Sequence, residues 1–214
     1  MSKGLKREMS EVLSQGLQAM RLHLSESIQN KLIEYIELLS KWNSVHNLTA
    51  VRDPLEMISR HVLDSLVLLP FLVPESSRLI DVGTGAGLPG IPLAISRPAQ
   101  QFVLLDSNQK KIAFVQHVII SLGLSNVLAV CVRAEGYQPK EPFDWVVSRA
   151  FASLSEFVWL SHHLCRPEGR LIAMKGALDP AEVSAVPAEY LIEKIQSVQV
   201  PGLEARSLVF VAVK

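Results

Sequence analysis

Four glycines lie within residues 83–90, directly after a short apolar segment, Leu79–Val82. Glycine reaches positive φ at little cost and allows a ligand to lie directly on the backbone. The apolar residues that follow have helical spacing, so the first N–H groups of a helix, which lack partners within the helix, would face such a ligand. A strand, a glycine-rich turn and a helix in this order are typical of a site that holds a nucleotide.

One interpretation of this turn is a dinucleotide site. The pattern Gly85-x-Gly87-x-x-Gly90 has the required spacing, and Asp106 lies about 20 residues further on, where an acidic side chain would bind the ribose. However, this interpretation leaves two residues unexplained between the end of the apolar segment and the first glycine of the pattern.

The alternative is a site for S-adenosylmethionine. The pattern Asp81-x-Gly83-x-Gly85-x-Gly87 is that of methyltransferases that use this cofactor, and it places the first glycine where the apolar segment stops. Asp106 ends the next apolar segment, and its two carboxylate oxygens can accept hydrogen bonds from both ribose hydroxyls. The position of the strand end therefore favours this second interpretation.

Further candidate residues follow the third and fourth predicted strands, because ligands of an open parallel sheet bind beyond the carboxyl ends of its strands. Ala134 and Glu135 would lie along the adenine, where a backbone N–H and a carboxylate can hydrogen-bond to its edge. Arg149 directly follows the fourth strand, close to where methyl donor and acceptor must meet. We therefore predict that Arg149 contributes to catalysis as well as to binding.

Basic side chains are also expected at this edge of the sheet. The chain as a whole is neutral, with 21 basic and 21 acidic side chains, so no overall positive charge would attract a nucleic acid. Single basic side chains on loops are often only solvated, whereas several along one edge indicate phosphate contacts. The predicted patch consists of Lys110, Lys111, Arg133, Arg149 and Lys175.

The residues after the fourth predicted strand, Ser148-Arg149-Ala150-Phe151, restrict the methyl acceptor. They lack the acidic or amide residue and the prolines that commonly hold an exocyclic amine, and neither cysteine lies there as a nucleophile for carbon methylation. A purine ring nitrogen has a free lone pair and needs only in-line placement against the methyl donor. Phe151 would either stack on an unpaired base or belong to the core.

The histidines and cysteines indicate no metal site. None of the six histidines has metal-ligand spacing, and Cys131 and Cys165 are too far apart for a zinc pattern. We therefore expect two reduced thiols and no bound metal. His61 lies on a predicted helix that leads toward the sheet, where it would either line the cleft and contact RNA or pack in the interior.

The first 70 residues are predicted to be helical, because apolar residues recur there at helical spacing. Helices are predicted over residues 5–24, from a cap at Ser25 or Ser27 to near Asn43, and from the Asp53-Pro54 cap to Pro70. We expect residues 1–70 to form a helical extension and residues 71–214 to form the cofactor-binding domain.

Strands and helices alternate beyond residue 78, which predicts a parallel sheet with helices on both faces. A turn is expected at Pro167-Glu168-Gly169, and the last two strands should pair antiparallel because the link at 201–205 is too short for a helical crossover. The predicted strands are 79–82, 102–106, 127–132, 143–148, 170–175, 192–200 and 207–213, and the predicted helices are 109–122, 154–165 and 181–186. This is an α/β fold of the Rossmann-like class I methyltransferase type, a mostly parallel seven-stranded sheet with an antiparallel C-terminal hairpin.

The chain lacks the sequence features of a secreted or membrane protein. Its first eight residues are polar, and its longest apolar run, Leu66–Val73, falls short of the about 20 residues that span a bilayer. We expect a monomeric cytoplasmic protein without membrane contact.

At the level of whole motifs, the chain resembles the ribosomal small-subunit methyltransferase G family, also called glucose-inhibited division protein B, over roughly residues 30–214. The motifs that carry the resemblance are Lys41-Trp42-Asn43, Asn47-Leu48-Thr49, Arg60-His61-x-x-Asp64-Ser65, the stretch Asp81–Leu93, Leu105-Asp106-Ser107, Ser148–Leu154 and Lys175-Gly176. The family often has proline where this chain has Ala86, a small change within the cofactor turn.

The resemblance implies transfer of a methyl group from S-adenosylmethionine to N7 of one guanosine in bacterial 16S ribosomal RNA, as free RNA or in a 30S particle. It also implies cofactor contacts at Gly83, Leu88, Ala134, Glu135 and Arg149. The residues by themselves predict only a methyltransferase that acts on a nucleic acid. Two alternatives remain: a non-enzymatic ribosome or division factor that holds the nucleotide as a structural ligand, and a small-molecule methyltransferase.

Overall fold

The fold is organised around a single seven-stranded sheet in a computed structural model that describes residues 2–74, 77–149, 153–204 and 206–213. The strand order is β3-β2-β1-β4-β5-β7-β6; β1 to β5 are parallel, and β7 pairs antiparallel with both β5 and β6. The strands are β1 Arg78–Val82, β2 Gln101–Asp106, β3 Val127–Cys131, β4 Phe143–Arg149, β5 Cys165–Lys175, β6 Leu191–Val198 and β7 Arg206–Ala212. The predicted α/β methyltransferase-type fold is confirmed.

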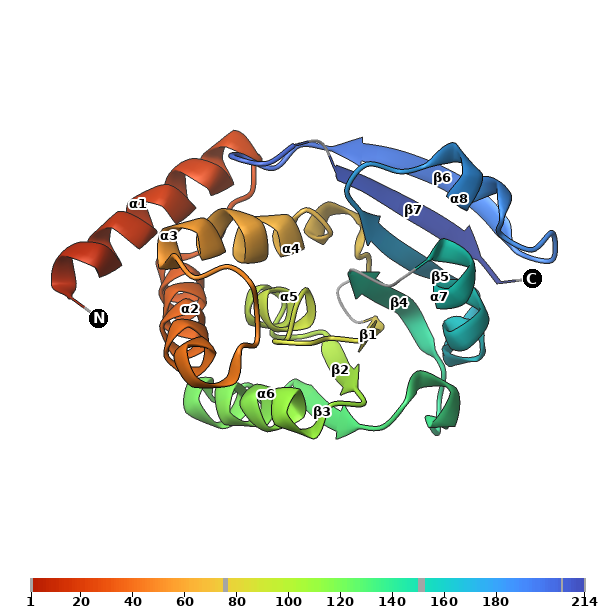
Figure 1. Ribbon diagram of the computed structural model, residues 1–214, viewed down its shortest axis with the longest axis horizontal. Coiled ribbons are helices and arrows are strands. Elements are labelled where there is room, and N and C mark those ends of the chain that lie inside the picture. The colour runs from red at the N-terminus through yellow and green to blue at the C-terminus, as the bar shows by residue number, and fades with distance from the viewer. Residues whose placement is uncertain (1, 75–76, 150–152, 205, 214) are drawn as a thin grey trace.

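Helices cover both faces of the sheet, because the side chains of each strand alternate between two apolar clusters. In β1, Leu79 packs in the cluster formed with α5 (Gly90–Ser96) and α6 (Gln109–Leu122), whereas Ile80 packs in the cluster formed with α7 (Leu154–Ser161). In Figure 1 the sheet runs from β3 at the bottom to β6 at the top, with α5 and α6 to the left and α7 to the right.

The two N-terminal helices, α1 (Lys3–Ala19) and α2 (Glu26–His46), share the first of these clusters with α5 and α6. The Oγ of Ser25 accepts a hydrogen bond from Ile28 N at 3.4 Å, so Ser25 rather than Ser27 caps α2. The helix α1 ends earlier than predicted, because Arg21 has a φ of 55°, which a helix cannot include. The apolar core is continuous across residue 70, and a domain boundary there stays a prediction.

The third predicted helix contains a π-helical segment. It begins at Pro54, capped by Asp53 as expected, but only α3 (Pro54–Met57) and α4 (Asp64–Leu66) are α-helical. Between them lies η1 (Ile58–Leu63), and a 3₁₀ turn, η2 (Leu69–Phe71), surrounds the proline that we expected to end the helix. π-helical turns within helices are frequent at functional sites.

The boundaries around β5 differ from those predicted. The helix expected over 154–165 ends at Ser161 and is followed by a 3₁₀ turn, η4 (His162–Leu164); β5 begins at Cys165. The predicted turn at 167–169 lies within β5, where pairing with β4 passes from Phe143↔Cys165 directly to Trp145↔Arg170. The extra residues thus form an irregularity in the strand rather than a separate connection.

The remaining elements lie close to their predicted positions. A 3₁₀ turn, η3 (Ala134–Gly136), follows β3, and a short helix, α8 (Pro180–Ser184), precedes the C-terminal hairpin. The hairpin pairs antiparallel as predicted, from Leu191↔Ala212 to Val198↔Arg206. Within the described ranges, no helix is both long and apolar enough to cross a membrane.

Candidate functional site

The glycine-rich turn leaves the carboxyl end of β1 in a conformation that requires glycine. The φ angles of Gly83, Gly85 and Gly87 are 72°, 60° and 86°, all in the left-handed region. A Cβ on Gly87 would also lie 2.5 Å from Cγ1 of Ile91. The backbone N–H groups of Gly83 and Thr84 both donate to the carbonyl of Leu105, at 2.8 and 2.9 Å, which fixes the turn against β2.

Asp81 supports this turn from beneath. Its carboxylate is fully buried, and Oδ2 accepts hydrogen bonds from Thr84 Oγ1 at 2.6 Å and from Gly90 N at 2.8 Å. Burial raises the pKa of Asp81 to about 6, and the hydrogen bonds from Thr84 and Gly90 oppose that rise. The predicted cofactor residue Asp81 therefore shapes the turn from its buried side.

A cavity of about 360 Å³ opens on the other side of the turn. Four predicted cofactor residues line it, at the ends of β1, β2 and β3: Gly83, Asp106, Ala134 and Glu135. Leu88, which was also predicted to contact the cofactor, is instead buried within the turn and is only 4% exposed. Glu156 and Leu160 of α7 close the cavity from the side, a contribution that the sequence patterns did not indicate. Its lining is Val82, Gly83, Leu105, Asp106, Ser107, Val132, Arg133, Ala134, Glu135, Glu156 and Leu160.

Asp106 is one of three acidic residues in the described lining of this first cavity, with Glu135 and Glu156. Its Oδ2 accepts a hydrogen bond from Gly85 N at 2.9 Å, and its Oδ1 accepts one from Asn108 N at 2.8 Å. Lys111 Nζ lies 3.8 Å from Oδ2. A carboxylate oxygen has two lone pairs, so each oxygen can accept one more hydrogen bond from a ligand hydroxyl. The predicted pairing of Asp106 with ribose hydroxyls fits this arrangement.

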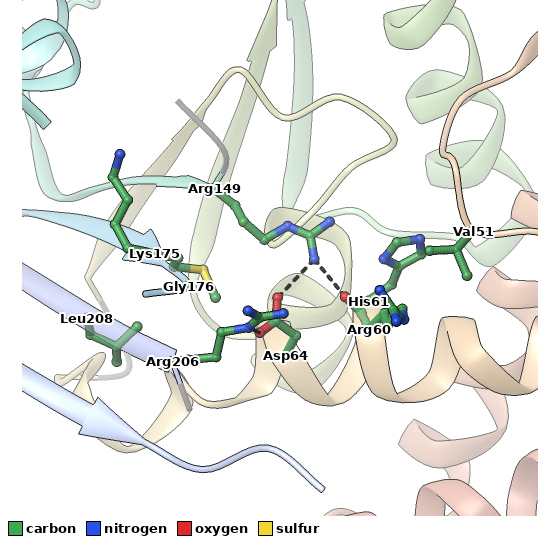
Figure 2. A pocket seen from close by; sticks show the side chains of 10 residues that line it. Val51, Arg60, His61, Asp64, Arg149, Lys175, Gly176, Arg206 and Leu208 are labelled. Atoms are coloured by element: carbon green, nitrogen blue, oxygen red, sulfur yellow. Dashed lines mark hydrogen bonds and ion pairs between the residues drawn. The ribbon is translucent and has the colours of Figure 1, made fainter. Parts of the chain in front are cut away.

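A second cavity, of about 340 Å³, lies at the ends of β4, β5 and β7 and is shown in Figure 2. The π-helical segment η1 supplies Arg60 and His61, and α4 supplies Asp64. The other lining residues are Val51, Arg149, Met174, Lys175, Gly176, Arg206 and Leu208. The cavity thus brings together side chains from the N-terminal helices, the central sheet and the C-terminal hairpin.

Asp64 joins two arginines across this second cavity. Its Oδ2 accepts a hydrogen bond from Arg149 Nη1 and its Oδ1 accepts one from Arg206 Nε, both at 3.1 Å. Arg149 Nη1 also donates to the carbonyl of Arg60 at 2.9 Å (Figure 2). Asp64 is 4% exposed, so this carboxylate is held almost entirely by protein groups. We did not predict roles for Asp64 or Arg206, although Asp64 belongs to the Arg60–Ser65 motif.

His61 lines the second cavity and is 6% exposed. Its Nε2 lies 2.9 Å from Thr49 Oγ1, and its buried Nδ1 has no hydrogen-bond partner among the described residues. Burial and the nearby positive charge of Arg149 lower the pKa of His61 to about 4. His61 is therefore neutral at pH 7, and any contact with RNA would not be an ion pair.

The five basic residues of the predicted patch do not form one row. Lys110 and Lys111 begin α6 next to Asp106, and Arg133 lines the first cavity. Arg149 and Lys175 line the second cavity. Lys175 Nζ lies 2.5 Å from Glu182 Oε1, so its charge already has a carboxylate partner, and in Figure 2 it points away from Asp64.

The two cavities are neighbours through β1 and β4, which pair directly. The hydroxyl of Ser148 donates to the carbonyl of Val82 at 2.7 Å, which holds Arg149 beside the start of the glycine turn. Phe151, predicted either to stack on a base or to join the core, lies outside the described residues. Among those that are described, no cluster of three or more His, Cys, Asp or Glu side chains is arranged to hold a metal ion.

The N-terminal helices also contact the cofactor turn. The hydroxyl of Tyr35, in α2, donates a hydrogen bond to the carbonyl of Ala86 at 2.8 Å, and the Tyr35 side chain is fully buried. This contact spans 51 residues of sequence. Local sequence patterns give no indication of a contact over this separation.

Solved structures of similar fold include methyltransferases. A SAM dependent methyltransferase from Aquifex aeolicus is 17% identical, with a TM-score of 0.56 over 78% of this chain and 97% of that chain. TrmK from M. capricolum, in complex with the cofactor product S-adenosyl-homocysteine, is 18% identical, with a TM-score of 0.54 over 69% of this chain and 66% of that chain. These similarities establish the fold.

Sequence comparisons identify the family. A protein of Nitrosococcus oceani named ribosomal RNA small subunit methyltransferase G is 48% identical, covering 91% of this chain and 90% of that protein. A protein of Nitrosomonas eutropha with the same name is 50% identical over 89% of this chain and 88% of its own length. The family model described as rRNA small subunit methyltransferase G matches residues 28–210. The chain therefore belongs to the rRNA small subunit methyltransferase G family.

Proposed function

We propose that this protein transfers a methyl group from S-adenosylmethionine to N7 of a guanosine in bacterial 16S ribosomal RNA. The observation that carries the proposal is the pair of adjoining cavities, one built on the glycine turn and Asp106, the other lined by arginines. The family relationship supplies the class of reaction and the kind of RNA.

The first cavity suits the nucleoside part of the cofactor. The free lone pairs of Asp106 would accept hydrogen bonds from the ribose hydroxyls, and the turn at Ala134 and Glu135 would contact the adenine. Gly83 and Gly85 leave backbone atoms uncovered, so a ligand can approach the turn without meeting a side chain.

The acceptor chemistry requires placement rather than proton transfer. When bound, S-adenosylmethionine supplies an electrophilic methyl group on a positively charged sulfur. In the transfer, the N7 lone pair would form the new N–C bond as the S–C bond breaks, so that the electron pair of that bond would stay on sulfur and the positive charge would pass to the purine. N7 carries no proton, so no general base is needed, in accord with an Asp64 whose two oxygens are engaged by arginines.

The role of Arg149 in this reaction is to hold the acceptor side of the site. Arg149 lies next to the glycine turn and is fixed by Asp64 and by the carbonyl of Arg60. A fixed guanidinium keeps its orientation when the acceptor base approaches. Correct placement of two reactants lowers the activation free energy by several kcal/mol. Arg149 is thus the residue that we assign to catalysis.

The RNA would approach from the edge that carries both cavities. Lys110, Lys111 and Arg133 lie beside the first cavity, where they would contact phosphates on that flank. Lys175 and His61 would contribute on the other flank, Lys175 only if Glu182 releases it. We further propose that the protein acts as a monomer in the cytoplasm, where ribosomal RNA resides, and that residues 1–70 form an extension to a catalytic domain of residues 71–214.

Methyl-labelled S-adenosylmethionine tests the proposed activity when it is mixed with the protein, 30S particles that lack the modification and a pool of small metabolites. Label in the RNA is the expected result. No transfer at all would favour a factor that binds the cofactor without catalysis. Label confined to the metabolites would favour a small-molecule methyltransferase. Arg149→Ala provides the control, because it should reduce transfer while leaving the folded protein intact.

A further inference from the structure

We propose that the second cavity binds a phosphodiester group of the RNA next to the acceptor nucleotide, with Arg206 as a phosphate-binding residue and Asp64 as its positioning residue. This inference rests on the proposed function, because it assigns the substrate contacts of the same site. It adds residues from the C-terminal hairpin and from α4 that neither the sequence patterns nor the family motifs marked as RNA contacts.

Within the described part of the chain, the charges around the cavity leave one guanidinium without a carboxylate of its own. Lys175 is paired with Glu182, and Arg60 Nε lies 3.5 Å from Glu56 Oε2. Of the described residues that line this cavity, only Asp64 carries a carboxylate, and it faces both Arg149 and Arg206. His61 adds no charge at pH 7 because its pKa is lowered to about 4. A cavity with this balance attracts an anion.

The arginines retain free hydrogen-bond donors that face this space. Asp64 engages Nη1 of Arg149 and Nε of Arg206. Among the described residues, no hydrogen-bond partner is found for Nη2 of Arg149 or for the two terminal nitrogens of Arg206. A planar guanidinium with two adjacent free N–H groups matches two oxygens of a phosphate, which is why arginine is favoured in phosphate recognition.

Asp64 holds these donors in place. A mobile arginine loses conformational entropy when it binds a phosphate, whereas a carboxylate that is 4% exposed and bonded to both guanidinium groups fixes them beforehand. Asp64 comes from the N-terminal helices, Arg149 from β4 and Arg206 from β7. The network therefore ties three parts of the chain together at the place where the substrate would bind.

The carboxylate of the cofactor is the other anion that could reach this region, and separate measurements of RNA affinity and cofactor affinity distinguish the two; the strand order bears only on the nucleoside part of the cofactor. In the strand order, β4 and β5 separate β7 from β1, and the first cavity lies on the opposite side of β1, toward β2 and β3. Three strand spacings of about 4.8 Å place β7 about 14 Å from β1. Arg206 is thus on the flank that faces away from the nucleoside part of the cofactor.

The test compares Arg206→Ala and Arg206→Lys with Arg7→Ala, a matched control on α1 whose side chain is 78% exposed and paired with Glu11. RNA affinity is measured with 30S particles over a range of salt, and cofactor affinity is measured by calorimetry. We expect Arg206→Ala to weaken RNA binding and to reduce the salt slope by up to about one unit. Arg206→Lys should keep the salt slope of RNA binding, because the positive charge remains. Its RNA affinity should be lower than that of the wild type, because lysine lacks the paired N–H donors of a guanidinium. Cofactor affinity should not change in any of these variants.

Asp64→Asn separates positioning from charge. The substitution removes a negative charge, so electrostatics alone would predict tighter RNA binding. If Asp64 positions the arginines, kcat/KM for RNA should fall several-fold while cofactor affinity is kept, and Asp64→Glu should restore part of the loss. A thermal melt of each variant establishes that it is folded.

Three results would overturn the inference. A salt slope of Arg206→Ala equal to that of Arg7→Ala and wild type would show that Arg206 does not contact phosphate. A loss of cofactor affinity in Arg206→Ala without a change in RNA binding would assign the cavity to the cofactor carboxylate. Both outcomes are compatible with methyl transfer by the wild-type protein, so they leave the proposed function in place. If the wild-type protein neither binds nor methylates RNA, the proposed function and this inference fail together.

Discussion

Asp81 and Asp106 show how two carboxylates of one sequence pattern take different roles. Both were predicted to contact the cofactor, since each ends or nearly ends a strand beside the glycine turn. The structure buries Asp81 fully beneath the turn, whereas Asp106 lines the first cavity. The difference follows from position along the strands: Asp81 pairs in register with Leu104, two residues before Asp106, which is the last residue of β2 and lies where the cavity opens.

Asp106→Ala should weaken cofactor binding by about 1–3 kcal/mol, the range for a hydrogen bond to a charged group. The substitution also leaves Gly85 N and Asn108 N without their acceptor, so part of the effect comes from the turn itself. Calorimetry with S-adenosylmethionine measures the loss, and Glu141→Ala, on an exposed surface, is the control. An unchanged affinity would mean that the ribose is held by other groups.

The neutral state of His61 gives a pH dependence with a definite sign. Its pKa is about 4 in the folded protein and about 6.5 when the chain is unfolded, so acidification from pH 7 protonates the unfolded state first. The contribution of neutral His61 to the free energy of unfolding is fully present above pH 6.5. It decreases as the pH falls toward 4, by up to about 1.4 kcal/mol per pH unit. Asp81, whose folded pKa is raised to about 6, acts in the opposite direction between pH 6 and 4.

His61→Gln should therefore lose less stability on acidification than the wild type, because the contribution of His61 is removed while that of Asp81 is kept. Chemical denaturation at pH 7, 6 and 5 measures this difference. Asp81→Asn is the reciprocal variant and should lose more stability than the wild type over the same range. Parallel stability curves for the wild type and His61→Gln would show that His61 titrates normally in the folded protein.

At the scale of elements, periodicity predicted the type and order of most helices and strands, because the helices bury one apolar stripe and the strands are apolar in short runs. Two features of the elements could not be predicted from periodicity. The π-helical segment at Ile58–Leu63 and the irregular pairing of β5 with β4 change hydrogen-bond registers without changing the apolar pattern. The first of these was missed although it builds one wall of the second cavity.

The helix α2 is more than a cover for the sheet, since Tyr35 bonds to the cofactor turn. Tyr35→Phe removes one hydrogen bond, so we expect a loss of about 0.5–1.5 kcal/mol in stability and a several-fold loss in cofactor affinity, because Ala86 is freed from its anchor. Thermal melts and calorimetry measure the two quantities, with Tyr190→Phe, on the β6 side of the molecule, as the control. A loss of stability with unchanged cofactor affinity would restrict Tyr35 to a structural role.

At the scale of the whole molecule, the second cavity depends on residues that are far apart in the sequence. The hydrogen bonds of Asp64 reach Arg149 and Arg206, across 85 and 142 residues. The rule that ligands bind at the carboxyl ends of parallel strands predicted the first cavity, and it predicted Arg149 and Lys175 at the same edge. It could not predict the contribution of η1, α4 and β7, since nothing in a local pattern specifies where the N-terminal helices and the C-terminal hairpin meet.

The zero net charge of the chain is compatible with RNA binding because of where the basic residues lie. Of the predicted patch, Arg133 lines the first cavity, Arg149 and Lys175 line the second, and Lys110 and Lys111 lie on α6. Several of these residues are paired with carboxylates of the protein itself, as Lys175 is with Glu182. Binding to RNA would then depend on a few fixed guanidinium groups rather than on a broad positive surface. The composition alone, with equal numbers of basic and acidic side chains, could not distinguish this arrangement from an ordinary surface.

The central claim is that the methyl group is placed on N7 of a guanosine in 16S ribosomal RNA. The most direct test is to methylate 30S particles that lack the modification, digest the RNA to nucleosides and identify the labelled nucleoside by mass spectrometry against an N7-methylguanosine standard. We predict that the label appears as N7-methylguanosine, at no more than one per particle, and that Arg149→Ala greatly reduces it. Label in any other nucleoside, or equal label with wild type and Arg149→Ala, would contradict this account of the site.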